Sequence, residues 1–315
     1  MTTLTANLLL LVAAAIWGFA FVAQRVGMDH MGPFTFNAIR FALGALSLVP
    51  IIRATRHRQV YRAPLRRLLL GGTALGVVLF GAATAQQVGL VTTTAGKAGF
   101  ITGLYVVLVP LLALAWGERA PWLTWAGAAL AVAGLYFLTM TDRLIPSAGD
   151  AWVLLCAVLF AAQIQLVAFL TQSIDPLPLA AAQFAVCAFL SGLVAVLTEP
   201  IAGPAIRAGL WPILYGGLMS VGVAYTLQTV TQRYAPPAPA AIIMSLESAF
   251  AALGGGLLLG ERLGTRGGLG AALMMAGMVL AQIKPAASSG FRPAELGVES
   301  GEEGQTGGHD EDHLC

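Results

Sequence analysis

The sequence contains little charge. Only 10% of its 315 residues are charged, whereas a soluble domain has roughly 25%. The hydrophobic share is 57% and the mean hydropathy is +0.80. A soluble protein with this much apolar surface would aggregate, so the solvent for most of the chain must be lipid. The composition therefore predicts an all-α integral membrane protein.

Other absences exclude classes of function. The net charge is only +2 and no long basic tract occurs, which excludes a nucleic-acid partner. Three cysteines without a CxxC pair or a paired-histidine spacing provide neither a disulfide framework nor a metal site. The sequence has no GxxxxGK[ST] loop, so the chain itself carries no ATP-driven pump. We expect no cofactor and no bound metal.

Apolar runs fill most of the chain. A membrane-spanning helix needs about 20 apolar residues. The segments that meet or nearly meet this length predict ten helices, at about 5–24, 33–52, 68–88, 94–116, 122–140, 151–171, 178–198, 209–230, 237–259 and 265–283. The first run lacks a basic region before it and continues past the length of a signal peptide, so we interpret it as a retained helix.

Loop charges predict the orientation. Six arginines fall between the second and third predicted helices: Arg53, Arg56, Arg58, Arg62, Arg66 and Arg67. Because Lys and Arg accumulate in cytoplasmic loops, this loop places both termini in the cytoplasm, with the chain in the inner or plasma membrane. Residues 285–315 are polar, rich in Gly and acidic, which predicts a disordered cytoplasmic tail.

The sequence also repeats itself. Gly117-Glu118-Arg119 recurs as Gly260-Glu261-Arg262, 143 positions later, and Gly127-Ala128-Ala129-Leu130 recurs as Gly270-Ala271-Ala272-Leu273 at the same offset. The repeat unit holds five helices, so residues 1–140 and 150–284 form two repeats. Because five is odd, the second repeat enters the membrane inverted relative to the first, as in many secondary transporters.

Several short motifs resemble a known family. They are Ala15-Ile16-Trp17-Gly18, Arg40-Phe41, the stretch Ala98–Pro110 that ends in VVLVP, and the repeat ends WGERA and LGERL. Over residues 5–283 the chain resembles the drug/metabolite transporter superfamily, in its EamA-type branch. The resemblance implies ten helices in two inverted halves, a central cavity, and transport of small metabolites, often export of amino acids. One departure is that Phe160-Ala161 stands in the sixth helix where the first has Trp17-Gly18.

Two charges lie inside predicted helices: Lys97 in the fourth and Glu247 in the ninth. Across the repeat Lys97 maps to Ala240 and Glu247 to Leu104, and positions seven apart share one helix face. The two charges therefore lie on equivalent faces. If both helices flank the two-fold axis, both charges point into a central cavity, where intramembrane charge is accommodated. We expect a water or a substrate between them rather than a direct ion pair.

Glu247 falls near the membrane midplane. A carboxyl group there can bind and release a proton as the site alternates between faces, or contact a substrate ammonium group. The alternative is a structural hydrogen bond to a neighbouring helix. Lys97 lies nearer the end of its helix, where it either attracts a substrate carboxylate or extends to the interface.

Aromatic and amide side chains extend the candidate site. Buried amides need partners, so an interhelical hydrogen bond is the alternative role for each glutamine. Gln163 and Gln165 point in nearly opposite directions, and we expect Gln163 to face the cavity. Trp17 either stacks on a substrate or only packs. The predicted substrate-binding or coupling residues are Glu247, Lys97, Trp17, Tyr105, Gln163, Tyr225, Gln228 and Gln87.

Two other features are interpreted as structural. Arg40 lies in the outer part of the second helix, and a structural ion pair or a contact with lipid headgroups is favoured there over substrate contact. Pro110 and the cluster Pro236-Pro237-Ala238-Pro239 predict bends at or near the fourth and ninth helices.

The sequence as a whole favours a secondary active transporter. It would export small metabolites or amino acids by alternating access, with a proton as a coupling partner and the lipid bilayer as its surroundings. A passive facilitator or channel is the main alternative. A membrane-embedded enzyme would need clustered His, Asp or Ser, whereas all four histidines fall in expected loops or in the tail. We therefore predict that the protein is not an enzyme.

Overall fold

The computed structural model describes residues 1–55, 63–93, 95–115, 117, 119–139, 148–259 and 264–283. Within these ranges every regular element is a helix and none is a strand. The helices are α1 (Thr3–Met28), α2 (Pro33–Thr55), α3 (Leu65–Thr92), α4 (Ala95–Gly103), α5 (Tyr105–Ala115), α6 (Trp122–Thr139), α7 (Ala148–Leu170), α8 (Pro176–Thr198), α9 (Gly203–Ala208), α10 (Leu210–Leu214), the π-helix η2 (Tyr215–Tyr225), α11 (Thr226–Thr231), α12 (Pro237–Met244), α13 (Glu247–Leu259) and α14 (Thr265–Gln282).

The helix lengths agree with a membrane-spanning chain. In the described part, eight segments are long and apolar enough to cross a membrane, and α6 and α14 are shorter apolar helices. Large apolar side chains such as Phe169, Val196 and Leu197 are exposed on the outside, whereas the interior is rich in alanine. Lipid rather than water can cover such a surface, and small interior residues let helices approach closely. The prediction of an all-helical membrane protein is confirmed.

Some predicted features lie outside the described residues. Lys97 belongs to α4, but its side chain is not described. The others are Arg56, Arg58 and Arg62 of the arginine-rich loop, the repeat-end charges Glu118, Glu261 and Arg262, and the tail from residue 284.

Proline and glycine set several helix ends. Pro33, Pro176 and Pro237 each occupy the first position of a helix, where the missing N–H has no intrahelical partner to lose. Gly117 follows α5 with φ of 80°, a left-handed conformation that favours glycine and ends the helix.

Two predicted helices are broken. The segments expected at 94–116 and 237–259 are each divided, the first at Leu104 and the second at Ser245 and Leu246. Pro110 lies inside α5 and Pro237 begins α12, so neither proline marks the break itself, and bending at these prolines stays a prediction. At the first break the Leu104 N–H donates to Ile101 O (3.2 Å), a tightened turn that ends α4.

The segment expected as one helix at 209–230 is also irregular. Its centre is the π-helix η2, which packs against α1 and α2. Glycines allow the close approach to α2: a Cβ on Gly217 would lie 2.7 Å from Leu43 Cβ, and a Cβ on Gly222 would lie 2.7 Å from Ser47 Oγ. π-Helical turns are frequent at functional sites.

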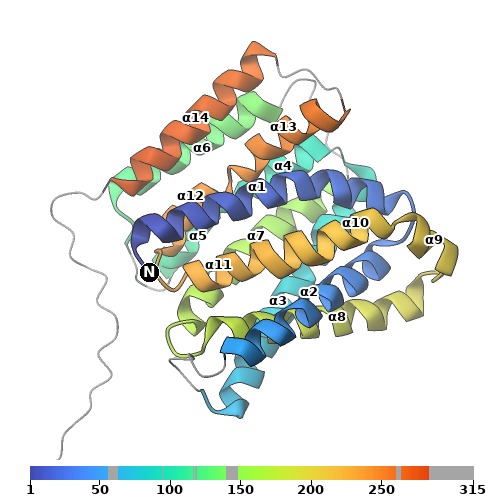
Figure 1. The fold of residues 1–315 in the computed structure, drawn as a ribbon. Helices are drawn as coiled ribbons and strands as arrows, with labels where there is room; N and C mark the ends of the chain where they lie inside the picture. The colour runs from blue at the N-terminus through green and yellow to red at the C-terminus, as the bar shows by residue number, and fades with distance from the viewer. Residues whose placement is uncertain are drawn as a thin grey trace, which may run out of the picture. The chain divides into compact units, whose positions relative to one another are not determined.

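Two of the packed helix pairs, α6 with α14 and α2 with α8, are related by the sequence repeat (Figure 1). α6 lies along α14, α2 lies along α8, α3 packs against α7 and α8, and α1 packs against α13. The residue bounds of α2 and α8 differ by 143 at both ends, and so do those of α6 and α14. The offset found in the sequence therefore relates helices that contact each other.

Backbone contacts join α6 to α14. A Cβ on Gly127 would lie 2.7 Å from Gly277 O, and a Cβ on Gly134 would lie 2.5 Å from Gly270 O. Each contact is the other one shifted by the repeat, since Gly127 maps to Gly270 and Gly134 to Gly277. This glycine contact has no room for a side chain on either helix.

Candidate functional site

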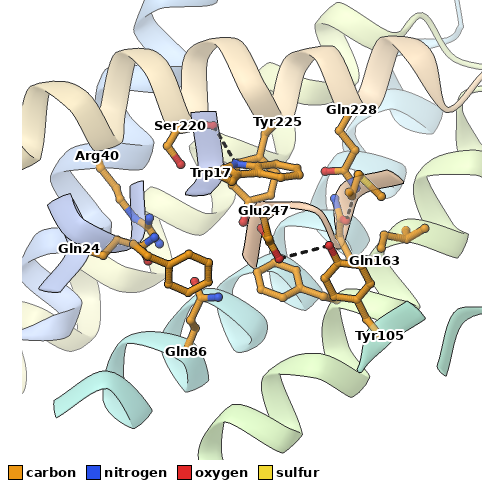
Figure 2. A pocket seen from close by; sticks show the side chains of 14 residues that line it. Trp17, Gln24, Arg40, Gln86, Tyr105, Gln163, Ser220, Tyr225, Gln228 and Glu247 are labelled. Atoms are coloured by element: carbon orange, nitrogen blue, oxygen red, sulfur yellow. Dashed lines mark hydrogen bonds between the residues drawn. The ribbon is translucent and has the colours of Figure 1, made fainter. Parts of the chain in front are cut away.

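A small cavity of about 40 Å³ lies among the helices. Its lining comes from α1, α2, α3, α5, α7, η2, α11, α12 and α13 (Figure 2). The lining residues are Trp17, Phe21, Gln24, Arg40, Gln86, Tyr105, Phe160, Gln163, Ile164, Ser220, Tyr225, Gln228, Met244 and Glu247. Neither α6 nor α14 contributes to it.

The two helix breaks meet at the cavity. Tyr105 begins α5 and Glu247 begins α13, so each is the first helical residue after a break. The Tyr105 hydroxyl donates to Glu247 Oε1 at 3.2 Å, and Glu247 is only 6% exposed. A break in a helix frees backbone groups and lets the chain change direction. Here it allows the Glu247 carboxylate to face the cavity rather than lipid.

Aromatic rings form one wall. The Trp17 and Tyr225 ring centroids are 4.7 Å apart with the planes at 63°, and the Phe160 ring lies 6.5 Å from that of Tyr225. Trp17 Nε1 donates to Ser220 O in η2 at 3.3 Å. In Figure 2 the Trp17 indole and the Tyr225 phenol lie together beside Glu247. The aromatic wall therefore includes residues from α1, α7 and η2.

A chain of amides runs from the cavity into the interface of α7, α8 and α11. Gln228 Nε2 donates to Gln163 Oε1 (3.0 Å), and Gln163 Nε2 donates to Gln183 Oε1 (3.4 Å). Gln183 Nε2 then donates to Thr229 Oγ1 (3.2 Å). Because every link runs in the same direction, the orientation of each amide is fixed by its neighbour.

Arg40 also lines the cavity, contrary to the interpretation that placed it near lipid headgroups. Its side chain is only 1% exposed, and Nε donates to Asn37 Oδ1 at 2.9 Å. The guanidinium carbon lies 5.3 Å from the Phe36 ring centroid and 4.9 Å from that of Phe41. Gly216 of η2 lies beside the Arg40 side chain and helps to cover it.

The structure brings six of the eight candidate site residues together: Trp17, Tyr105, Gln163, Tyr225, Gln228 and Glu247. Gln165 points away from the cavity and donates to Val109 O (2.9 Å), as its spacing from Gln163 predicts. Gln87 does not line the cavity; its Nε2 contacts Met28 Sδ at 3.3 Å, and the neighbouring Gln86 faces the cavity instead.

Some lining residues were not among the candidates. They are Phe21, Gln24, Gln86, Phe160, Ile164, Ser220 and Met244. The repeat offset could have found one of these, because the candidate Trp17 maps to Phe160; Phe21 and Ile164 also map onto each other, and both pairs line the cavity. Phe160 therefore occupies the position in the second half that Trp17 occupies in the first.

Known proteins resemble this chain over most of its length. An uncharacterized transporter of Archaeoglobus fulgidus is 31% identical over 282 residues, which cover 89% of this chain and 87% of that protein. The uncharacterized transporter YwfM of Bacillus subtilis is 27% identical over 294 residues, covering 89% and 94%. A solved crystal structure shares the fold with a TM-score of 0.74 at 20% identity, over 88% of this chain and 96% of its own.

The chain has helices that can span a membrane, a cavity lined in part by polar side chains, and transporters as relatives. It is therefore a membrane transporter. The model of the EamA-like transporter family matches residues 4–140 and again residues 147–282. The chain belongs to this family, within the drug/metabolite transporter superfamily, and the resemblance seen in its motifs is confirmed.

Proposed function

We propose that the protein is a secondary active transporter that exports small metabolites or amino acids by alternating access, with Glu247 as the proton-coupling group. The observation that carries the proposal is the placement of Glu247. Its carboxylate is buried, lines the cavity, and is bonded to Tyr105 of the other half of the chain. A carboxyl group so placed can exchange its hydrogen-bond donor for a proton or a solute when the halves move.

The architecture in this proposal has ten membrane-spanning segments in two inverted repeats, 1–140 and 150–284. Its support is the glycine contact between α6 and α14. In a two-fold symmetric interface residue i contacts j and residue j contacts i, and the Gly127–Gly277 and Gly134–Gly270 contacts have this reciprocal relation under the repeat. The paired breaks next to Tyr105 and Glu247 fit the same scheme.

Transport into proteoliposomes tests the coupling. The purified protein is reconstituted, a pH gradient is imposed, and uptake of labelled amino acids is followed with the wild type and with Glu247→Gln. We expect the gradient to drive accumulation above equilibrium in the wild type and to have no effect in Glu247→Gln. The matched control is Asp29→Asn, which changes an exposed carboxylate away from the cavity and should leave coupling intact.

Each other outcome contradicts part of the proposal. Uptake that never exceeds equilibrium under any gradient would indicate a passive facilitator. Coupling that persists in Glu247→Gln would show that another group carries the proton. Failure of every tested solute to move would refute export of amino acids.

The proposed location is the inner or plasma membrane with both termini in the cytoplasm. Cys156 and Cys187 are buried, so an impermeant maleimide should label Cys315 in the tail preferentially. We expect labelling only after cells are permeabilised. Labelling of intact cells would contradict the orientation predicted from the arginine-rich loop.

A further inference from the structure

The cavity contains a cation without an ion-pair partner. Of the described lining residues only Arg40 carries a positive charge, and none of the described Asp or Glu side chains forms an ion pair with it. Glu247 bonds to Tyr105 instead. Burying a charge without a countercharge costs several kcal/mol, so this guanidinium is suited to an anion that enters the cavity.

Its surroundings hold the guanidinium in one orientation. Nε is occupied by Asn37 Oδ1, and the Phe36 and Phe41 rings lie against the guanidinium. The two terminal amino groups remain for a ligand. A planar pair of N–H donors matches the two oxygens of a carboxylate, which is the geometry that distinguishes arginine from lysine in anion binding.

The second half of the chain offers no equivalent site. Gln183 occupies the position that corresponds to Arg40 across the repeat. Both polar atoms of its side-chain amide are hydrogen-bonded, because Oε1 accepts from Gln163 and Nε2 donates to Thr229. The cavity is therefore asymmetric, with its cation on the α2 side.

Two buried acceptors in the lining also lack partners. Gln24 Oε1 and Gln228 Oε1 have no hydrogen-bond donor, although these side chains are only 4% and 2% exposed. Leaving such an atom unsatisfied costs about 1–3 kcal/mol. Gln228 cannot simply turn its amide, since its Nε2 is held by Gln163. In Figure 2 Gln24 lies beside Arg40, whereas Gln228 lies at the other end of the cavity, so a small ligand bound by Arg40 meets the Gln24 oxygen and not that of Gln228.

We propose that Arg40 binds the carboxylate of the transported solute and that Gln24, which lies beside Arg40 in Figure 2, accepts a hydrogen bond from its nitrogen. This inference rests on the proposed function and narrows its substrate class to small solutes that carry both a carboxylate and an N–H donor. The wall of Trp17, Phe160 and Tyr225 receives their apolar part. Arg40, which was interpreted from the sequence as structural, is in this proposal a residue that determines substrate specificity.

Binding to the full-length protein in detergent tests this inference without requiring transport. Thermal stabilisation is measured with phenylalanine, phenylalaninamide, phenethylamine and 3-phenylpropanoate, and again with leucine and leucinamide in case one side chain does not fit. We expect each amino acid to bind at least about tenfold more tightly than its amide, and phenethylamine to bind as weakly as phenylalaninamide. We also expect 3-phenylpropanoate, which lacks the nitrogen, to bind more weakly than phenylalanine.

Two variants connect the carboxylate preference to Arg40. Arg40→Gln should reduce the difference between an amino acid and its amide to within about twofold, and Arg40→Lys should reduce it several-fold because lysine lacks the planar pair of donors. Arg25→Gln, which changes an exposed arginine of α1, is the matched control and should keep the wild-type preference.

The possible failures are distinguishable. Equal stabilisation by acids and amides in the wild type, no stabilisation by any of the acids, or an unchanged preference in folded Arg40→Gln would each overturn the role of Arg40. If Arg40→Gln does not fold, the wild-type series and Arg40→Lys still decide the question. Carboxylate-selective binding without flux would refute the transport proposal and leave the anion site intact, whereas gradient-driven flux without carboxylate preference would refute only the anion site.

Discussion

The hydroxyl of Tyr105 donates a 3.2 Å hydrogen bond to the carboxylate of Glu247, 142 residues further along the chain. Each residue begins a helix directly after a break, so the bond joins the two places where the backbone is least constrained by intrahelical bonding. Any change in the spacing of α5 and α13 must lengthen or break it. Two substitutions around this centre, a third in the contact between α6 and α14, and a fourth at a helix terminus have definite expected outcomes.

Tyr105→Phe removes the hydroxyl and leaves Glu247 without this donor. A buried acceptor that loses its partner costs about 1–3 kcal/mol, so we expect a lower melting temperature in detergent and slower solute uptake. Tyr136→Phe removes an exposed hydroxyl from α6 and should change neither. A Tyr105→Phe protein that melts and transports like the wild type would contradict a role for this bond.

Trp17→Phe keeps an aromatic ring against Tyr225 but loses the N–H donated to Ser220 O. Without this hydrogen bond, which is worth about 0.5–1.5 kcal/mol, the ring is no longer held in one orientation and a bound solute must order it, so we expect solute binding to weaken by up to about tenfold. The comparison is Trp152→Phe, which changes an exposed tryptophan of α7. Equal binding by both variants would show that the indole N–H is not needed.

Gly134→Ala should destabilise the protein, because its new Cβ would lie 2.5 Å from Gly270 O and 2.6 Å from Met274 Cγ. Gly268→Ala, on α14, meets no atom within 4 Å. Since alanine favours a helix over glycine by about 1 kcal/mol, this control should be neutral or stabilising. Melting temperatures that shift in the same direction for both variants would contradict the glycine contact.

Glu199→Ala removes the cap of α2. Its carboxylate accepts from Phe34 N (2.9 Å), Thr35 N (2.8 Å) and Thr35 Oγ1 (2.6 Å). Loss of a helix cap typically costs about 1 kcal/mol, so we expect a measurable fall in melting temperature. Asp29→Ala breaks one exposed ion pair with Arg25, which should cost less than about 0.5 kcal/mol. Similar losses for both would refute capping by Glu199.

The positions of six of the fourteen cavity residues could be predicted from the sequence. A polar residue in an apolar helix must face a partner or a cavity, and this rule alone selected Gln163, Gln228 and Glu247. The rule fails where two polar residues are adjacent. Gln86 and Gln87 lie about 100° apart around α3, and the rotation of that helix depends on packing against α7 and α8.

The irregular backbone could not be predicted in the same way. The π-helix η2 and the break at Leu104 have no local signal comparable to proline, and Pro110 lies inside α5 rather than at the break. The surroundings of Arg40 depend on η2, since Gly216 lies against its side chain. A residue assigned to the membrane surface from its position along α2 therefore lies in the cavity.

The contact between α6 and α14 has a mechanical consequence. Where backbone meets backbone at Gly127, Gly134, Gly270 and Gly277 there are no rotamers to rearrange, so the distance between these two helices cannot adjust by repacking. This pair can serve as a fixed pivot, and the helices around the cavity must provide whatever movement opens it to either side.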